Sequence, residues 1–371
     1  MEFGLFNLMQ SRDPKVAPEP LYAHTLDMVR AAEDGGFAMA WFAEHHFSTY
    51  SLCASPMVMA AWCAAKTSRI KLAPGVLLLP LYEPVRLIQE LAMLDALSGG
   101  RFVLGFGTGY QPYEFRRFGI DLKEGGNRYM EFLEMIEVGL TRGEFAYKGR
   151  YYEVPEAMLA IRSGRAFNPV YVAGVLNHPG IRRHTAERRY VPLLAPGWNP
   201  ISLVEGQLAA YREVAKAEGV EPADFPFSVM RVVHVTDSKA DALGAAEAFR
   251  YSTRAAAALR FDYATFTGIV PDDMPAKDEP TLEQIAANCI IGDPLHCAER
   301  IVNEVKRLTP YHYACFMDSG AYDRGKVRRS LDRFAAEVIP LVRKALPDLD
   351  AIGGKPGALR TGADFKLAAA Q

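Results

Sequence analysis

The residues with the clearest capacity for chemistry are Glu44, His45 and His46, which follow the apolar run 38–43. A histidine titrates near neutral pH and can act as a general acid or base beside a reacting group. Adjacent side chains on an extended segment point in opposite directions. One histidine is therefore expected to face a reactive centre while the other packs or pairs with a carboxylate. The alternative is that they are surface or helix-capping histidines.

A metal site is not predicted, because metal ions need several ligands at clustered or helical spacing. The other histidines considered as ligands are spread over different predicted elements: His178, His184, His234, His296 and His312.

A glycine-rich loop follows another apolar run, in the segment 105–110 (GFGTGY). Glycines at such a position allow backbone N–H groups to approach a phosphate closely. The spacing is GxGxG rather than GxGxxG, which disfavours a Rossmann site. Arg128 begins the next predicted helix and can turn back onto the same phosphate. The alternatives are a tight turn that closes a barrel strand and a solvated arginine.

The elements that must position these residues alternate along the chain. Eight short apolar runs predict strands at 2–8, 38–43, 70–79, 101–106, 169–174, 190–195, 227–236 and 311–318. Helical spacing predicts helices at 20–34, 56–66, 85–97, 128–141, 182–188, 203–218, 240–258 and 327–345. This alternation predicts an α/β fold, a (β/α)8 TIM barrel over residues 1–345, with catalytic groups at the carboxyl ends of its strands. The alternative architecture is a doubly wound open sheet.

Three segments depart from this alternation. The aromatic stretch 143–155 predicts a surface hairpin or extended arm. The segment 260–288 is rich in Pro, Asp and Thr, and its length after the seventh helix indicates a lid-like insertion. The C-terminal tail 346–371 has little periodicity and is predicted to be mobile or to pack on a neighbouring molecule.

Composition excludes several classes of function. The formal net charge is −2 with no long basic run, so a nucleic-acid partner is not expected. The amino terminus is typical of a first β-strand rather than a signal peptide, and no apolar run reaches membrane-spanning length. The five cysteines are scattered without a CxxC pair, which favours buried thiols and a cytoplasmic location.

The order and spacing of several motifs resemble those of the bacterial luciferase-like family of flavin-dependent oxidoreductases. The motifs are EHHF at 44–47, LPxxxP at 79–84, LSGGRFVLGFGTGY at 97–110, Arg128, PVYVAG at 169–174 and IIGDP at 290–294. The resemblance implies a TIM-type barrel with insertions, in agreement with the strand count.

The resemblance also implies where FMN binds. Its phosphate is expected where the strand-four loop, the helix-start arginine and the end of strand five converge, at Thr108, Gly109, Tyr110, Arg128, Gly174, Val175 and Leu176. The isoalloxazine ring is expected across the barrel mouth, near His45, Gly75, Val76 and Trp198. His45 is the implied catalytic residue, with His46 or Glu44 orienting it.

The implied reaction is that of a monooxygenase. A separate NAD(P)H:flavin reductase would supply reduced FMN, O2 would be the co-substrate, and a C4a-peroxyflavin would oxygenate a small hydrophobic or ring-containing substrate. The sequence offers an apolar, aromatic set for the substrate pocket, which is alternatively part of the barrel-rim core: Tyr50, Leu52, Leu81, Tyr82, Tyr110 and Tyr113. A homodimer through the helices 56–66 and 85–97 is expected.

Two departures from the luciferase pattern limit this carry-over. Val175 and Leu176 stand where luciferases place an acidic residue and a serine at the phosphate, so backbone groups, Asn177 or His178 must make that contact. Gly107 replaces the luciferase cysteine, so aldehyde-dependent light emission is not expected. The rival functions are a deazaflavin-dependent dehydrogenase of the same superfamily and a non-catalytic flavin-binding relative.

Overall fold

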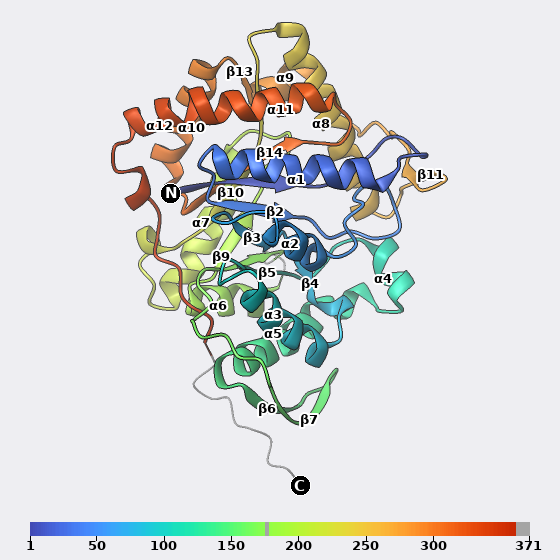
Figure 1. Cartoon of the computed structure of the whole chain (residues 1–371), viewed down its shortest axis with the longest axis vertical. Coiled ribbons are helices and arrows are strands. Elements are labelled where there is room, and N and C mark those ends of the chain that lie inside the picture. Colours follow the sequence, from blue (N-terminus) through green and yellow to red (C-terminus); the bar gives the residue numbers. More distant parts are fainter. Residues whose placement is uncertain (175–177, 361–371) are drawn as a thin grey trace.

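Residues 1–174 and 178–360 are described by the computed structural model, which shows a parallel β-barrel surrounded by helices (Figure 1). The barrel strands are β1 (Glu2–Asn7), β2 (Met39–Phe42), β3 (Lys71–Pro74) with β4 (Leu77–Leu78), β5 (Leu104–Gly107), β8 (Val170–Ala173), β9 (Val191–Leu194), β10 (Ser228–Val235) and β14 (His312–Asp318). They pair in the order β3-β2-β1-β14-β10-β9-β8-β5-β4, and every pair is parallel. A backbone bridge between Leu72 and Phe102 joins β3 to the residues before β5 and closes the circle. The predicted barrel is confirmed.

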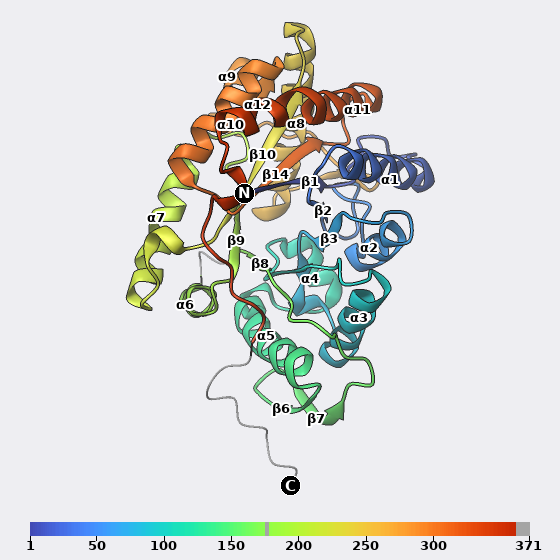
Figure 2. The ribbon, with the colours of Figure 1, turned by 60° about the vertical axis from the view of Figure 1, so that its left-hand side comes forward.

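The helices cover the outside of this barrel, as Figure 2 shows. They are α1 (Pro18–Asp34), α2 (Pro56–Ala64), α3 (Pro84–Leu97), α5 (Gly125–Arg142), α6 (Pro179–Arg188), α7 (Ser202–Ala217), α8 (Lys239–Arg260), α10 (Pro294–Leu308), α11 (Arg324–Arg333) and α12 (Ile339–Ala345), the last two joined by the π-helical turn Phe334–Val338. None of the helices in the described residues combines the length and the apolar character needed to cross a membrane.

Several elements were not predicted from the sequence: α4 (Pro112–Phe118), α9 (Leu282–Asn288), β13 (Ile290–Gly292), which pairs with β10, and α10. Helix α10 begins where the Asp293 side chain accepts a hydrogen bond from the His296 N–H at 2.9 Å. It buries Cys297, Ile301 and Val305 on one face, at the spacing of an amphipathic helix.

The apolar residues form two layers because side chains alternate along each strand. One cluster lies between the strands and the helices and includes Phe3 and Leu5. The other fills the barrel and includes Phe6, Trp41 and Tyr171. We call the amino-terminal ends of the strands the floor of the barrel, and the carboxyl-terminal ends its mouth.

Smaller elements decorate the barrel. The predicted hairpin is present as β6 (Glu144–Lys148) and β7 (Glu153–Met158), which are antiparallel. The predicted lid contains the hairpin of β11 (Phe266–Thr267) and β12 (Val270–Pro271), followed by α9. Short 3-10 turns lie at Leu79–Leu81, Leu122–Glu124, Pro222–Asp224 and Leu349–Ala351.

The tail differs from the expectation as far as residue 360. Leu349 and Leu359 are buried, and the Leu359 N–H donates to the Phe167 carbonyl at 2.8 Å. The amino group of Met1 donates to the carbonyls of Leu349 and Ile352. Residues 346–360 therefore pack on the chain's own barrel, where the side chains of Leu349 and Leu359 are buried.

Candidate functional site

The mouth of the barrel brings together the loop after β2, the loop after β5 and helix α4. His45 lies in the first loop and is 8% exposed. Its Nδ1 is 3.0 Å from Oε1 of Glu114, a fully buried residue of α4. Its Nε2 is 3.4 Å from the hydroxyl of Tyr110, and its ring centroid is 4.8 Å from that of Tyr50. His45 is thus an enclosed imidazole with a carboxylate behind it.

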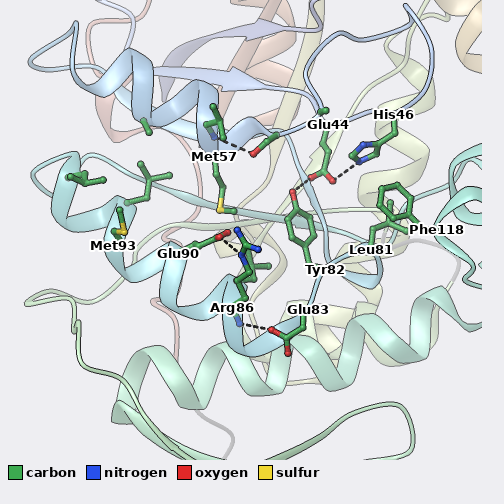
Figure 3. Close-up of a pocket in the computed structure, with 17 residues that line it drawn as sticks. Glu44, His46, Met57, Leu81, Tyr82, Glu83, Arg86, Glu90, Met93 and Phe118 are labelled. Atoms are coloured by element: carbon green, nitrogen blue, oxygen red, sulfur yellow. Dashed lines mark hydrogen bonds and ion pairs between the residues drawn. The ribbon is translucent and has the colours of Figure 1, made fainter. Parts of the chain in front are cut away.

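His46 points the other way, as expected for an adjacent residue. Its Nε2 is 3.0 Å from Oε1 of Glu44, and the second oxygen of Glu44 accepts hydrogen bonds from the Tyr82 hydroxyl at 2.9 Å and the Leu78 N–H at 3.2 Å. Burial raises the pKa of Glu44, while these hydrogen bonds oppose the rise. Figure 3 shows Glu44 between Tyr82 and His46.

These contacts correct one part of the sequence interpretation. Glu44 and His46 were expected to orient His45, but in the structure they pair with each other. The residue that contacts His45 is Glu114, 69 positions further along the chain. Sequence reasoning missed it, because the only local signal was a lone acidic residue between Tyr113 and Phe115 in a short segment.

The glycine-rich loop forms one wall of a cradle at the mouth. Gly174 has φ +75°, and a Cβ there would lie 2.7 Å from Oγ1 of Thr108. A Cβ on Gly126, near the start of α5, would lie 2.6 Å from the ring of His178. Thr108, Gly174 and the first turns of α5 and α6 therefore converge with little side-chain bulk between them. Such a place suits a phosphate, because helix amino termini present free N–H groups.

Arg128 lies in the first turns of α5 rather than at its first residue. Its guanidinium pairs with Glu124 at 3.0 Å and lies 4.7 Å from the Tyr151 ring centroid. Gly109 also has a positive φ, and a Cβ at this residue would lie 2.4 Å from the ring of Phe115. The predicted contacts Val175 and Leu176, and Asn177, lie outside the described residues.

The predicted ring-binding residues lie at the inner edge of the mouth. Gly75 and Val76 connect β3 to β4 through a cis peptide bond. A Cβ on Gly107 would lie 2.4 Å from Cγ2 of Val76, so only glycine lets this strand end approach Val76. Trp198 follows β9 and packs on the cluster that fills the barrel, and its carbonyl accepts a hydrogen bond from the Asn288 amide at 2.9 Å.

The predicted substrate residues separate into two groups. Tyr50 and Tyr113 belong to the barrel cluster near His45, and Tyr113 stacks on Phe266 with ring centroids 4.6 Å apart. Leu81 and Tyr82 line a cavity of about 560 Å³ that lies against α2 and α3 and is also lined by Glu44 and His46. Leu52 lines a second cavity, between α1 and α2.

The segment after α8 covers the mouth from one side. The Ile269 carbonyl accepts a hydrogen bond from the Thr49 N–H at 2.8 Å, and Asp262 forms a two-pronged ion pair with Arg116 of α4. The Arg260 guanidinium lies 4.1 Å from the Tyr110 ring centroid. The predicted lid therefore adjoins the same loops that hold His45. In the described residues, no group of three His, Cys, Asp or Glu side chains is arranged to hold a metal ion.

Comparison with known proteins agrees with this geometry. A family model described as luciferase-like monooxygenase matches residues 1–311. The chain is 24% identical, over 94% of its length and 97% of the relative, to the oxygenase component of a flavin-dependent trigonelline monooxygenase from Acinetobacter baylyi.

Two solved structures share the fold. One is the oxygenating constituent of 3,6-diketocamphane monooxygenase from Pseudomonas putida in complex with FMN, with TM-score 0.74, 22% identity, and coverage of 92% of this chain and 98% of that one. The other is the coenzyme F420 dependent tetrahydromethanopterin reductase of Methanopyrus kandleri, with TM-score 0.68, 20% identity and coverage of 91% and 98%. The chain is therefore an enzyme of the luciferase-like monooxygenase family.

Proposed function

We propose that this chain is the oxygenase component of a two-component monooxygenase that uses reduced FMN and O2 on a small hydrophobic or ring-containing substrate. The observation that carries the proposal is His45, buried at the barrel mouth against Glu114 and facing Tyr110. Family membership and the named flavin-dependent relative support the same function.

The residues at the mouth fit a flavin. Thr108, Gly174 and the start of α5 leave a cradle that a single Cβ would obstruct, which suits the phosphate. We propose that the isoalloxazine ring would lie against Gly75 and Val76, which connect β3 to β4, and Trp198, which packs on the cluster inside the barrel. When bound, reduced FMN would supply the electrons that activate O2.

The protein's own contribution is to position, to exclude water and to move a proton. His45 would exchange a proton through Nε2, the nitrogen on the side of Tyr110. The segment 261–281 would keep water from the reacting groups, because its hairpin is bonded to the loop that carries His45.

The proposed partners are a flavin reductase and a second copy of the chain. Helices α2 and α3 expose large apolar side chains that line the cavity of Figure 3, namely Val58, Met93 and Leu97, and α2 also exposes Trp62 at the neighbouring cavity. An exposed apolar patch of this kind is typical of an interface. We propose a homodimer through this face, located with its reductase in the cytoplasm.

Sedimentation of the wild type and of Leu97→Lys tests the oligomeric state. The variant should be monomeric, and a monomeric wild type would refute the dimer.

The test of function is anaerobic binding of three cofactors: reduced FMN, oxidised FMN and reduced deazaflavin. We expect reduced FMN to bind most tightly. Preferential binding of the deazaflavin would favour a dehydrogenase that transfers hydride without O2, the function suggested by the fold shared with the F420-dependent reductase. Preferential, tight binding of oxidised FMN would favour a non-catalytic flavin-binding protein.

A further inference from the structure

Glu114 is a buried carboxylate with a specific relation to His45. It is 0% exposed, and its Oε1 accepts a hydrogen bond from the His46 backbone N–H at 2.7 Å while facing Nδ1 of His45 at 3.0 Å. Its Oε2 is also buried and has no hydrogen-bond partner within the described residues. A buried carboxylate is stabilised only by the donors that reach it, so Nδ1 of His45 matters to both side chains.

The geometry determines which nitrogen of His45 carries the proton. If Nδ1 were unprotonated, its lone pair would lie 3.0 Å from an anionic oxygen, which is repulsive. With the proton on Nδ1, the contact is a charge-assisted hydrogen bond. In the neutral imidazole the other nitrogen, Nε2, then has a free lone pair, and this nitrogen is the one near the Tyr110 hydroxyl.

The remaining groups around His45 do not replace this carboxylate. Tyr50 and Tyr110 are neutral phenols whose pKa values are raised by burial. The Arg260 guanidinium lies 4.1 Å from the Tyr110 ring centroid. The Gln111 amide, whose Nε2 is 3.1 Å from Nδ1, carries no charge, and its Oε1 has no hydrogen-bond partner within the described residues. Exchange of the amide nitrogen and oxygen would give the Nδ1 proton a second acceptor. Glu114 is therefore the carboxylate in hydrogen-bonding contact with the imidazole.

Helix α4 is held in place from its other side. Arg116 pairs with Asp262, and Tyr113 stacks on Phe266 and donates a hydrogen bond to the Phe47 carbonyl at 3.1 Å. A seven-residue helix has little stability by itself. These contacts with the segment after α8 and with the His45 loop therefore help to fix where Glu114 stands.

We propose that Glu114 is a positioning residue that holds the His45 imidazole with its proton on Nδ1 and presents Nε2 to the reactants. The effect of Glu114 on the reaction rests on the proposed function, whereas the position of the proton on the His45 ring does not. We predict that the neutral His45 ring carries its proton on Nδ1, because Oε1 of Glu114 accepts a hydrogen bond from that nitrogen.

The first test uses the protein without cofactor. ¹⁵N-histidine NMR of the full chain, with the His45 signals assigned by comparison with His45→Gln, reports which nitrogen of the neutral ring is protonated. We expect Nδ1–H in the wild type. In Glu114→Gln, which keeps the shape of the side chain, the share of rings protonated on Nδ1 should fall at least about two-fold, because a neutral amide does not select that nitrogen by charge. Wild-type protonation on Nε2, or an unchanged share of the two tautomers in Glu114→Gln, would overturn the proposal.

A matched control comes from another buried glutamate–histidine pair. Glu137 of α5 contacts Nε2 of His184 at 2.8 Å, outside the mouth. Glu137→Gln should leave the His45 signals unchanged, although it disturbs a buried pair of the same kind. If it shifts them as much as Glu114→Gln does, the effect is a general loosening and the proposal fails.

The second test uses the loaded enzyme. Glu114→Gln should lower the rate of the proton-dependent step by about 10²-fold, with little change in flavin affinity. A loss confined to flavin affinity would contradict a positioning role. If the NMR result holds but no flavin binds, the proposed function fails while the tautomer assignment stands.

Discussion

Histidine side chains have different surroundings at the mouth and at the floor of the barrel. At the mouth, His45 and His46 each lie 3.0 Å from a buried glutamate. At the floor, His312 is fully buried, and its Nε2 accepts a hydrogen bond from the Trp41 indole N–H at 3.0 Å. Burial, together with smaller effects from the charges of Lys71 and the amino terminus, lowers the pKa of His312 to about 3.

The difference shows what a carboxylate contributes. An imidazole beside a carboxylate has an acceptor for its N–H, whereas His312, which contacts Trp41 and Tyr171, is held neutral by burial. A Cβ on Gly4 would lie 2.4 Å from Nε2 of His312, so the floor is closely packed at this point. The histidine–glutamate contacts of His45 and His46 thus lie at the mouth, the end where catalytic groups gather in this fold, and close packing lies at the floor.

The largest expected effect is the dependence of the free energy of unfolding on pH that arises from His312 at the floor. The unfolded chain binds the His312 proton near pH 6.5, while the folded chain binds it only near pH 3. Stability is therefore present above pH 6.5 and is lost as pH falls toward 3, by about 2 kcal/mol between pH 6.5 and 4.5. Denaturant unfolding of wild type and His312→Gln at both pH values measures it. A variant with the same acid loss as wild type would show that His312 is not the cause.

The next effect tests the cradle at the mouth. Gly174→Ala places a Cβ against Thr108 at a residue with φ +75°, so FMN affinity should fall by about 10-fold. The control is Gly164→Ala, where nothing lies within 4 Å of the added Cβ. Titration with reduced FMN compares them. Equal affinities for the two variants would place the phosphate elsewhere.

The smallest expected effect concerns the ion pair between Arg116 and Asp262, whose side chains are 57% and 45% exposed. Arg116→Ala should change the free energy of unfolding by less than about 1 kcal/mol, because solvent screens an exposed pair. It should leave the tautomer of His45 unchanged, because the contacts of Tyr113 with Phe266 and with the Phe47 carbonyl still hold α4 and Glu114 in place. A change in the His45 NMR signals as large as that in Glu114→Gln would show that the segment after α8 controls the mouth directly.

The local sequence pattern predicted the barrel strands, but it predicted only some of the contacts between side chains at the mouth. Apolar runs and the glycine-rich loop are local signals, so the eight barrel strands and the opposed histidines could be inferred. The partner of His45 could not, because Glu114 meets it across 69 residues and only through the fold. Residue type also did not reveal that Leu52 lines a separate cavity, between α1 and α2.

We propose that the mouth of the barrel performs flavin-dependent oxygen chemistry with His45. The most direct test mixes the anaerobic complex of protein and reduced FMN rapidly with oxygenated buffer. We predict a transient absorbance unlike that of reduced or oxidised FMN, with a lifetime at least about 10-fold shorter in His45→Ala and little changed in His312→Gln. Oxidation of the bound flavin as fast as that of free flavin, in wild type and variants alike, would contradict the account.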